Sequence, residues 1–171
     1  MPVRDSDGAG PGGSRPGGSA PGLAVRLTPY RSDVVGELEA EVQAEYVVRY
    51  GGPDETPVDP TQFAPPDGAF VVAYVGDEPV AMGGFRRHDE DSVEVKRMFV
   101  AAGHRGRGHA RTVLAELERL ARAAGYRRVV LETGMRQPEA IELYASAGYT
   151  PIAGFGHYRD SPLNRCFARP L

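Results

Sequence analysis

The sequence has no tryptophan and only one cysteine, Cys166. A single cysteine cannot form an internal disulfide or a cysteine metal cage, so neither of these can stabilise the chain. This cysteine usage indicates a reducing compartment, and we expect a cytoplasmic protein. No apolar run approaches the roughly 20 residues that a helix needs to cross a bilayer, which excludes a membrane span.

A large excess of one charge is lacking as well. The 20 basic and 23 acidic side chains give a net charge of −3, and 41% of the residues are hydrophobic. This is the composition of a soluble globular protein. Because the chain carries no excess of positive charge, it has no general attraction for phosphate backbones, which argues against a nucleic-acid binder. Nineteen of the basic residues are arginine and only Lys96 is lysine, a bias that codon usage in a GC-rich genome explains.

The first 22 residues differ in composition from the rest of the chain. They contain seven glycines and four prolines, and their few apolar side chains cannot offset the entropy of ordering the segment. We therefore expect a disordered tail over residues 1–22. The whole chain of 171 residues has the length of one domain, so we expect a single folded domain over residues 23–171.

After the tail, strand and helix patterns alternate along the chain. Strand patterns lie at 23–27, 69–75, 80–85, 93–100, 128–132, 150–152 and 166–168, and helical spacing at 35–46, 113–124 and 138–145. The tight turns between the second, third and fourth strands predict antiparallel neighbours, whereas a strand reached through a helix is expected to be parallel to the strand before it. These elements predict an α/β fold with a mixed sheet of six to seven strands, flanked by about four helices.

A glycine-rich turn at residues 103–111 joins an apolar strand to the longest expected helix. Its glycines let the backbone approach a ligand closely, and the first N–H groups of the helix have no intrahelical partners. Since the helix dipole and these N–H groups both favour anions, the turn predicts a phosphate site. Arg105, Arg107 and Arg111 add positive charge beside it.

Two common phosphate-binding loops do not fit this turn. A Walker A loop ends in Gly-Lys-Ser or Gly-Lys-Thr, and the turn has no lysine. A dinucleotide fingerprint needs three glycines, but Arg111 stands where the third would follow Gly106 and Gly108. On this segment alone, a tight turn without a ligand remains the alternative.

Residues 105–110 read Arg-Gly-Arg-Gly-His-Ala and resemble Arg/Gln-x-x-Gly-x-Gly/Ala, the pyrophosphate-binding signature of the GNAT superfamily of N-acetyltransferases. Residues 95–100 are similar to the family's fourth strand, and Gln137-Pro138 and Gly148-Tyr149 resemble parts of its second conserved block. The resemblance implies the family's fold and acetyl-CoA as acyl donor. It also implies direct transfer of the acetyl group to a primary amine in a ternary complex.

The same resemblance implies which residues hold the donor. It places the pantetheine arm along the fourth strand and the pyrophosphate on the glycine-rich turn. Gln137 stands where the family often has asparagine. The implied acetyl-CoA-binding residues are Met98, Phe99, Val100, Arg105, Gly106, Arg107, Gly108, His109, Ala110 and Gln137.

Acetyl transfer needs a proton acceptor for the amine and a hydrogen-bond or proton donor for the departing thiolate. An alkylamine with a pKa of about 10 is protonated at neutral pH and must lose its proton before it attacks. The resemblance puts Tyr144 beside the sulfur of CoA as the donor, and core packing against Ile141 is the alternative role of this residue. Strand N–H groups at 98–100 are candidates to bind the developing oxyanion.

Glu94 is the candidate base. It lies eleven residues before the signature at 105–110, the spacing of the base glutamate in the histone-type members that the chain resembles. Strand alternation places Glu94 on one side with Lys96, Met98 and Val100. Pairing with neighbouring basic side chains at the surface is the alternative role of this carboxylate, and Glu132 is the competing base.

No metal site is expected, because His104 and His109 lack further ligands nearby. The expected partner is a small-molecule or peptide amine, with no nucleic acid and no membrane, and a homodimer is left open. An alternative function from a different class is a non-catalytic acyl-CoA-binding or sensor module on the same fold. Tyr144 beside an intact loop argues against that alternative.

Overall fold

The computed structural model describes residues 22–171, so the predicted tail lies outside the described residues except for Gly22. No helix of this described part is long and apolar enough to cross a bilayer.

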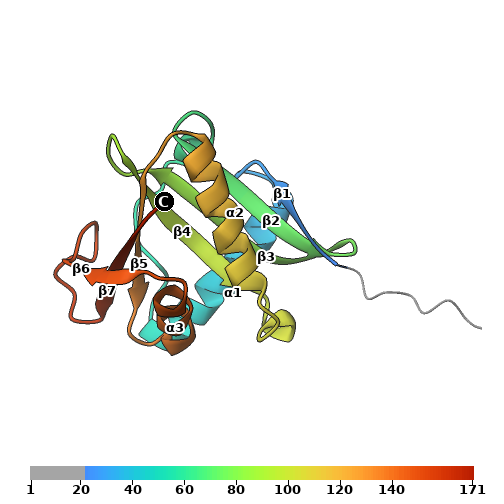
Figure 1. Cartoon of the computed structure of the whole chain (residues 1–171). Helices are drawn as coiled ribbons and strands as arrows, with labels where there is room; N and C mark the ends of the chain where they lie inside the picture. Colours follow the sequence, from blue (N-terminus) through green and yellow to red (C-terminus); the bar gives the residue numbers. More distant parts are fainter. Residues whose placement is uncertain (1–21) are drawn as a thin grey trace, which may run out of the picture.

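A seven-stranded mixed sheet forms the centre of the domain, with the order β1-β2-β3-β4-β5-β7-β6 (Figure 1). Its strands are β1 (Leu23–Leu27), β2 (Gly68–Val75), β3 (Glu78–Arg87), β4 (Ser92–Val100), β5 (Arg128–Gly134), β6 (Thr150–Ile152) and β7 (Asn164–Pro170). Strands β4 and β5 run parallel, and the other neighbouring pairs are antiparallel. The mixed sheet, the antiparallel run β2-β3-β4 and the parallel β4–β5 pair are confirmed.

Three α-helices cover the two faces of the sheet. Helix α2 (His109–Ala123) lies in front of it in Figure 1 and α1 (Asp33–Tyr50) behind it, and α3 is formed by Pro138–Ser146. One core cluster packs the sheet against α2, with Val113, Leu114 and Leu117 fully buried. The other packs it against α1. The alternating strand pattern thus sends side chains into both layers.

The prediction of about four helices is wrong by one in this part of the chain. After α1 ends at Gly51, with a left-handed φ of 84°, the chain forms only the short 3₁₀ turn η1 (Pro60–Phe63) before β2. Residues 51–66 contain Gly51, Gly52 and five prolines. Proline removes a backbone donor and clashes with the preceding turn, so this segment cannot continue as an α-helix.

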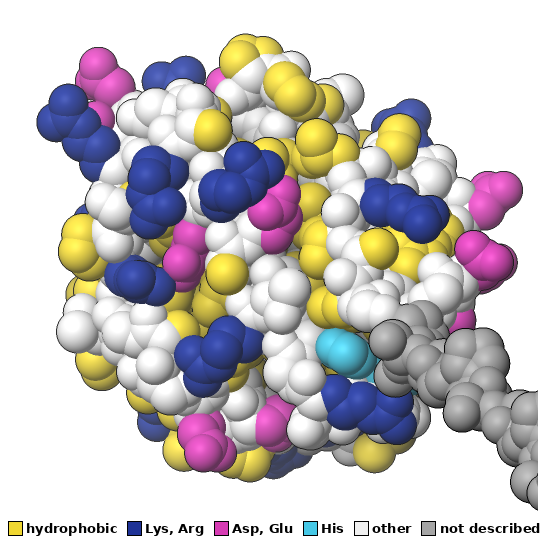
Figure 2. Space-filling model, turned by 45° about the vertical axis from the view of Figure 1, so that its right-hand side comes forward, with side chains coloured by type: hydrophobic (Ala, Val, Ile, Leu, Met, Phe, Trp, Pro, Cys, Tyr) yellow, Lys and Arg dark blue, Asp and Glu magenta, His cyan; other side chains and the backbone are white. Residues whose placement is uncertain are grey.

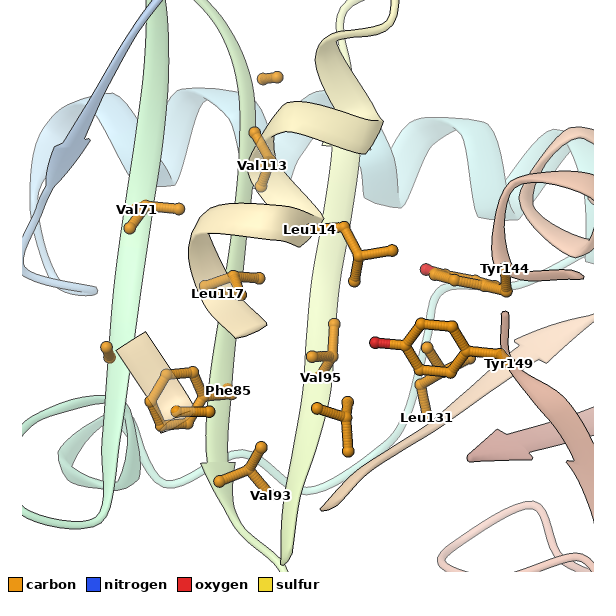
Figure 3. Packing of buried hydrophobic residues seen from close by; sticks show 14 of the residues in the cluster. Val71, Phe85, Val93, Val95, Val113, Leu114, Leu117, Leu131, Tyr144 and Tyr149 are labelled. Atoms are coloured by element: carbon orange, nitrogen blue, oxygen red, sulfur yellow. The ribbon is translucent and has the colours of Figure 1, made fainter. Parts of the chain in front are cut away.

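A partly buried ion pair joins α2 to β7. Glu118 of α2 accepts a hydrogen bond of 2.8 Å from the hydroxyl of Tyr149 and two bonds from Arg169 of β7. Figure 3 shows Tyr144 and Tyr149 entering the core side by side and pointing toward α2 and β4. This cluster fixes the start of β6 and the end of α3 against the core.

Strand β4 contains a bulge at Arg97. Met82 pairs with Phe99 and Gly84 with Lys96, so Gly83 of β3 stands opposite both Arg97 and Met98. Arg97 has a φ of 59°, in the left-handed region that side chains other than glycine rarely adopt. A bulge inserts one unpaired residue and bends the strand.

The bulge reverses the side-chain pattern of β4, which corrects the expected alternation. Met98 and Val100 pack into the α2 core, whereas Arg97 contacts Glu39 of α1 on the opposite face. Glu94 and Lys96 therefore do not share a side with Met98 and Val100, because two consecutive residues, Lys96 and Arg97, face the α1 side. Regular alternation cannot anticipate such an inserted residue.

The guanidinium of Arg97 holds the bulge in place. Its Nε donates to Glu39 at 2.8 Å, its Nη1 pairs with Asp54 in the loop after α1, and only 6% of its side chain is exposed. A cation buried this way ties β4 to two other segments, and removing it leaves two largely buried carboxylates unpaired.

We predict that Arg97→Met lowers the free energy of unfolding by about 3 kcal/mol, because it leaves buried acids without their partner. Denaturant unfolding measures the change. The matched control is Arg87→Met, whose side chain is 52% exposed and lies 3.6 Å from Asp67; we expect it to cost less than about 0.5 kcal/mol. Equal losses in the two variants would contradict a structural role for the Arg97 pairs.

Candidate active site

The parallel strands β4 and β5 separate in the middle of the sheet. The pairing of β4 with β5 extends from Ser92 and Arg128 to Val95 and Leu131 and then stops. Beyond this point the edge of β4 that faces β5 has no strand partner, so its backbone groups are available to a ligand. Two cavities meet where the strands separate.

The first cavity, the donor-side cavity, has a volume of about 640 Å³ and runs from the parting strands to the start of α2. Its lining includes nine of the ten residues that the resemblance assigns to acetyl-CoA: Met98, Phe99, Val100, Arg105, Gly106, Gly108, His109, Ala110 and Gln137. Arg107 is exposed and lies outside this lining. The structure thus brings nearly the whole predicted set together around one space.

The glycine-rich turn presents an open backbone to this cavity. Gly106 and Gly108 have φ values of 71° and 80°, and a Cβ at either position would meet no atom within 4 Å. Gly108 is the N-cap of α2, so the first N–H groups of the helix face outward. Burial, followed by the charges of His104 and Arg107, lowers the pKa of His109, which keeps that ring neutral at neutral pH.

Arg105 fastens the turn to its surroundings. Its Nε donates to the carbonyl of Val100 at 2.9 Å, and its guanidinium pairs with Glu45 of α1 and lies 5.8 Å from the ring centre of Phe99. An anion bound at the turn would share this guanidinium with Glu45.

The second cavity, the acceptor-side cavity, has a volume of about 450 Å³ and lies between the loop after α1 and the segment before β7. A hydrogen bond of 2.8 Å from the backbone N–H of Glu55 to the hydroxyl of Tyr158 joins these two segments at the cavity. Polar and aromatic side chains dominate the lining, among them Tyr46, Tyr50, Asp54, Glu55, Tyr158 and Asn164.

The two cavities share a junction. The residues that line both are Tyr46, Val95, Lys96, Arg97, Glu132, Thr133 and Gln137. A molecule in one cavity and a molecule in the other therefore meet beside the same side chains.

A chain of buried charges crosses this junction. Lys96 Nζ lies 2.9 Å from Glu132 Oε1 and 3.1 Å from Glu94 Oε1, and Arg86 Nε lies 2.8 Å from Glu94 Oε2. Both predicted base candidates are thus joined through the only lysine of the chain. Glu132 lines both cavities, whereas Glu94 lies behind Lys96 and lines neither.

Asp54 is held ionised at the edge of the acceptor-side cavity. Burial works against its charge, but hydrogen bonds from the hydroxyl and N–H of Thr56 and the pairing with Arg97 outweigh burial and hold the pKa of Asp54 below its usual value. The carboxylate therefore keeps its charge at neutral pH.

Tyr144 of α3 is buried and lines the donor-side cavity. Its ring centre lies 5.7 Å from that of Tyr149 and 6.4 Å from that of Phe167. Burial, with a smaller contribution from Tyr46, raises the pKa of Tyr144 well above its usual range. The phenol is therefore neutral at neutral pH and able to donate a hydrogen bond into the cavity.

Residues 37–149 match the acetyltransferase (GNAT) family. This chain belongs to that family. The match extends from within α1 to Tyr149 and includes strands β2 to β5, α2 and α3, and so all of the glycine-rich turn, Glu94, Glu132 and Tyr144.

Relatives and solved structures of GNAT proteins agree with this assignment. The chain is 37% identical over 115 residues to an IAA acetyltransferase of Azospirillum brasilense, which covers 67% of this chain and 75% of that protein. It is 31% identical over 137 residues to the N-acetylaspartate synthetase of Rattus norvegicus, which covers 80% of this chain and 43% of the rat protein. The chain thus spans less than half of that relative.

Two solved structures share the fold. One is described as an acyl-CoA N-acyltransferase from Klebsiella pneumoniae, with a TM-score of 0.74 and 25% identity over 87% of this chain and 97% of that one. The other, a GNAT acetyltransferase of Elizabethkingia anophelis with acetyl-CoA bound, has a TM-score of 0.63 and 14% identity over 87% of this chain and 98% of that one. The GNAT chain described here is an acyltransferase, and acetyl-CoA is the acyl donor of its fold.

Some residues of the candidate site were missed by the sequence interpretation. Lys96, Arg97 and Asn164 were not assigned to the site, although Lys96 and Arg97 line both cavities. The available signal was the charged run Glu94, Lys96 and Arg97 inside an apolar strand, since charges are rarely buried without a partner or a function.

Figure 2 shows one face of the GNAT domain, on which Lys and Arg side chains lie apart with acidic and apolar side chains between them. A nucleic-acid-binding surface gathers its basic residues into a patch or stripe, and this face carries none. No group of three or more metal-ligating side chains is found within residues 22–171.

Proposed function

We propose that this protein transfers the acetyl group of acetyl-CoA directly to a primary amine of a small molecule or peptide, with both substrates bound at once. The observation that carries the proposal is the junction of the two cavities at Lys96, Arg97 and Glu132. Because one side of this junction is the glycine-rich turn and the other a polar cavity, donor and acceptor each have a separate entrance. Holding both reactants beside each other removes most of the entropic cost of their encounter.

In this proposal the donor lies along β4. Its phosphates contact the turn at 105–110 and the first N–H groups of α2, where the helix dipole favours negative charge. The thioester lies at the edge of β4 near Met98–Val100, whose unpaired backbone supplies N–H groups to the oxyanion. Gln137 contacts the arm of the cofactor from the start of α3.

We assign Tyr144 the role of hydrogen-bond donor to the departing thiolate of CoA. The raised pKa makes its phenol a weaker acid than a thiol, whose usual pKa is about 8.5. The phenol therefore stabilises the departing thiolate chiefly by a hydrogen bond, which it makes in the transition state and not to the neutral thioester.

We assign the removal of the amine's proton to the pair Glu94 and Glu132. Glu132 faces the junction and accepts the proton directly or through a water, and Lys96 orients its carboxylate. Glu94, the base expected from its spacing, reaches the junction only through Lys96. The geometry favours Glu132 as the group nearest the reacting nitrogen.

The second candidate, a non-catalytic acyl-CoA sensor, needs the donor-side cavity alone. The polar acceptor-side cavity, which opens beside the same lysine, favours the enzyme, because a sensor has no use for a second substrate.

We predict that Gly108→Ala weakens acetyl-CoA binding at least about tenfold, since a Cβ at a φ of 80° strains the turn and enters the space open to the phosphates. Calorimetric titration measures the affinity. Gly125→Ala is the matched control, because Gly125, with a φ of 94° and equally open space, follows the other end of α2. Both variants should lose about 1 kcal/mol of stability; a normal affinity in Gly108→Ala would remove the turn from the donor site.

The proposed function is tested by following CoA release with acetyl-CoA and a panel of amino acids, polyamines, aminoglycosides and peptides. We predict turnover by the wild type and a kcat about 10–100-fold lower in Tyr144→Phe, the effect of one hydrogen bond to a charged group. The affinity for acetyl-CoA should stay within about twofold, because the bond forms only in the transition state.

Tyr149→Phe is the control for Tyr144→Phe. Its hydroxyl bonds Glu118 away from both cavities, so it should lose about 1 kcal/mol of stability and keep its kcat. Binding of acetyl-CoA without turnover on any amine would establish the sensor instead. An unchanged kcat in Tyr144→Phe, with chemistry rate-limiting, would remove this residue from the mechanism.

We predict that Glu132→Gln lowers kcat/KM at neutral pH by about 10²–10⁴-fold and that the rate recovers as pH rises and the amine loses its proton in solution. Glu94→Gln removes the other carboxylate of Lys96 and should shift the pH profile much less. The profiles of both variants against the wild type measure this. A larger shift in Glu94→Gln would move the base role to Glu94, acting through Lys96.

A further inference from the structure

We infer that the acceptor is a cationic amine that carries no carboxylate beside its reacting nitrogen, and that the charge of the acceptor-side cavity selects it. This inference rests on the proposed acetyl transfer and names the substrate class of the same site. It depends on which charges of the cavity are already paired.

Both basic side chains that line the acceptor-side cavity form ion pairs with carboxylates of the protein. Lys96 lies between Glu94 and Glu132, and Arg97 lies between Glu39 and Asp54. The charge of both basic side chains is thus already balanced by acids of the protein. A carboxylate on the acceptor would add a further negative charge beside these acids, which like-charge repulsion makes unfavourable.

The acids of the lining outnumber its bases. The lining contains the acids Asp54, Glu55 and Glu132 and the bases Lys96 and Arg97, which gives a net charge of −1. Glu55 is the acid at the rim: its residue is exposed, and its carboxylate makes no ion pair within residues 22–171. The bond from its N–H to Tyr158 holds its backbone at the cavity. Because its carboxylate has no ion pair in this part of the chain, it can attract an incoming ammonium group.

The aromatic side chains of the cavity fit a cationic ligand as well. Tyr46 and Tyr50 lie with their ring centres 6.3 Å apart, and Tyr158 also lines the cavity. Burial raises the pKa of Tyr46 to about 12, so it stays neutral and offers a ring face instead of a charge. Phenol faces attract ammonium groups and pack against the body of the amine.

Matched acceptors separate charge from size. One set is tyramine, tyrosinamide and tyrosine; a second is putrescine, ornithinamide and ornithine. The amide has nearly the size of the amino acid but lacks its negative charge. We measure kcat/KM for each by CoA release across a range of pH, because the amines differ in pKa.

We expect each amine and its amide to react at least about tenfold better than the amino acid, a difference of about 1.4 kcal/mol. If the amide is as poor as the amino acid, size and not charge selects the acceptor and the inference is overturned. If the amino acids are the best acceptors, it is overturned too. No acetylation in either set or in the wider amine panel, with acetyl-CoA bound normally, would overturn the proposed function and the inference with it.

A variant at the rim tests the same point without disturbing the buried pairs. We expect Glu55→Gln to lower the preference for tyramine over tyrosine by about two- to fivefold, the effect of one exposed charge, and Glu55→Lys to lower it further. Glu90→Gln, an exposed acid in the turn between β3 and β4, should leave the preference unchanged. A preference that stays the same in Glu55→Lys would show that the cavity's charge does not select the acceptor.

Discussion

The site depends on one buried cation at the point where the central strands part. Arg97 adopts a left-handed backbone conformation that costs free energy for a residue with a side chain, and its pairs with Glu39 and Asp54 offset this cost. The resulting bulge ends the regular pairing of β4 just past Val95. The unpaired edge of β4 begins beside this insertion, and Arg97 lines both cavities.

The same bulge sorts the side chains of β4 between two tasks. Met98 and Val100 turn into the α2 core and so fix the strand beside the donor-side cavity. Lys96 and Arg97 turn the other way and meet carboxylates from α1, β5 and the loop after α1. Apolar packing on one face thus gives the rigidity that the charged face needs, because ionic contacts in a cavity keep their geometry only on a fixed backbone.

The donor-side and acceptor-side cavities differ in the charge that they favour in a ligand. The donor side offers helix N–H groups, open glycine backbone and Arg105, all of which favour phosphate. The acceptor side offers carboxylates whose basic neighbours are already paired, and Glu55 stands unpaired at its rim within the described residues. In the proposed function these opposite preferences hold an anionic cofactor and a cationic amine in their own cavities, which share Glu132. The family membership supplies the reaction type, and the charge of the acceptor-side cavity bears on its substrate.

The sequence by itself predicted the mixed sheet, the parallel β4–β5 pair and the glycine-rich turn, because these depend on local periodicity and on glycine's backbone freedom. The family resemblance also placed Tyr144 and Glu94 among the candidates, with Glu132 as the competing base. Only the tertiary structure decided which glutamate faces the cavities and that Lys96 joins them. These features depend on the bulge at Arg97 and on contacts between residues far apart in the chain, such as Lys96 with Glu132. No periodicity in the sequence records them, because one inserted residue inverts the side of every residue after it.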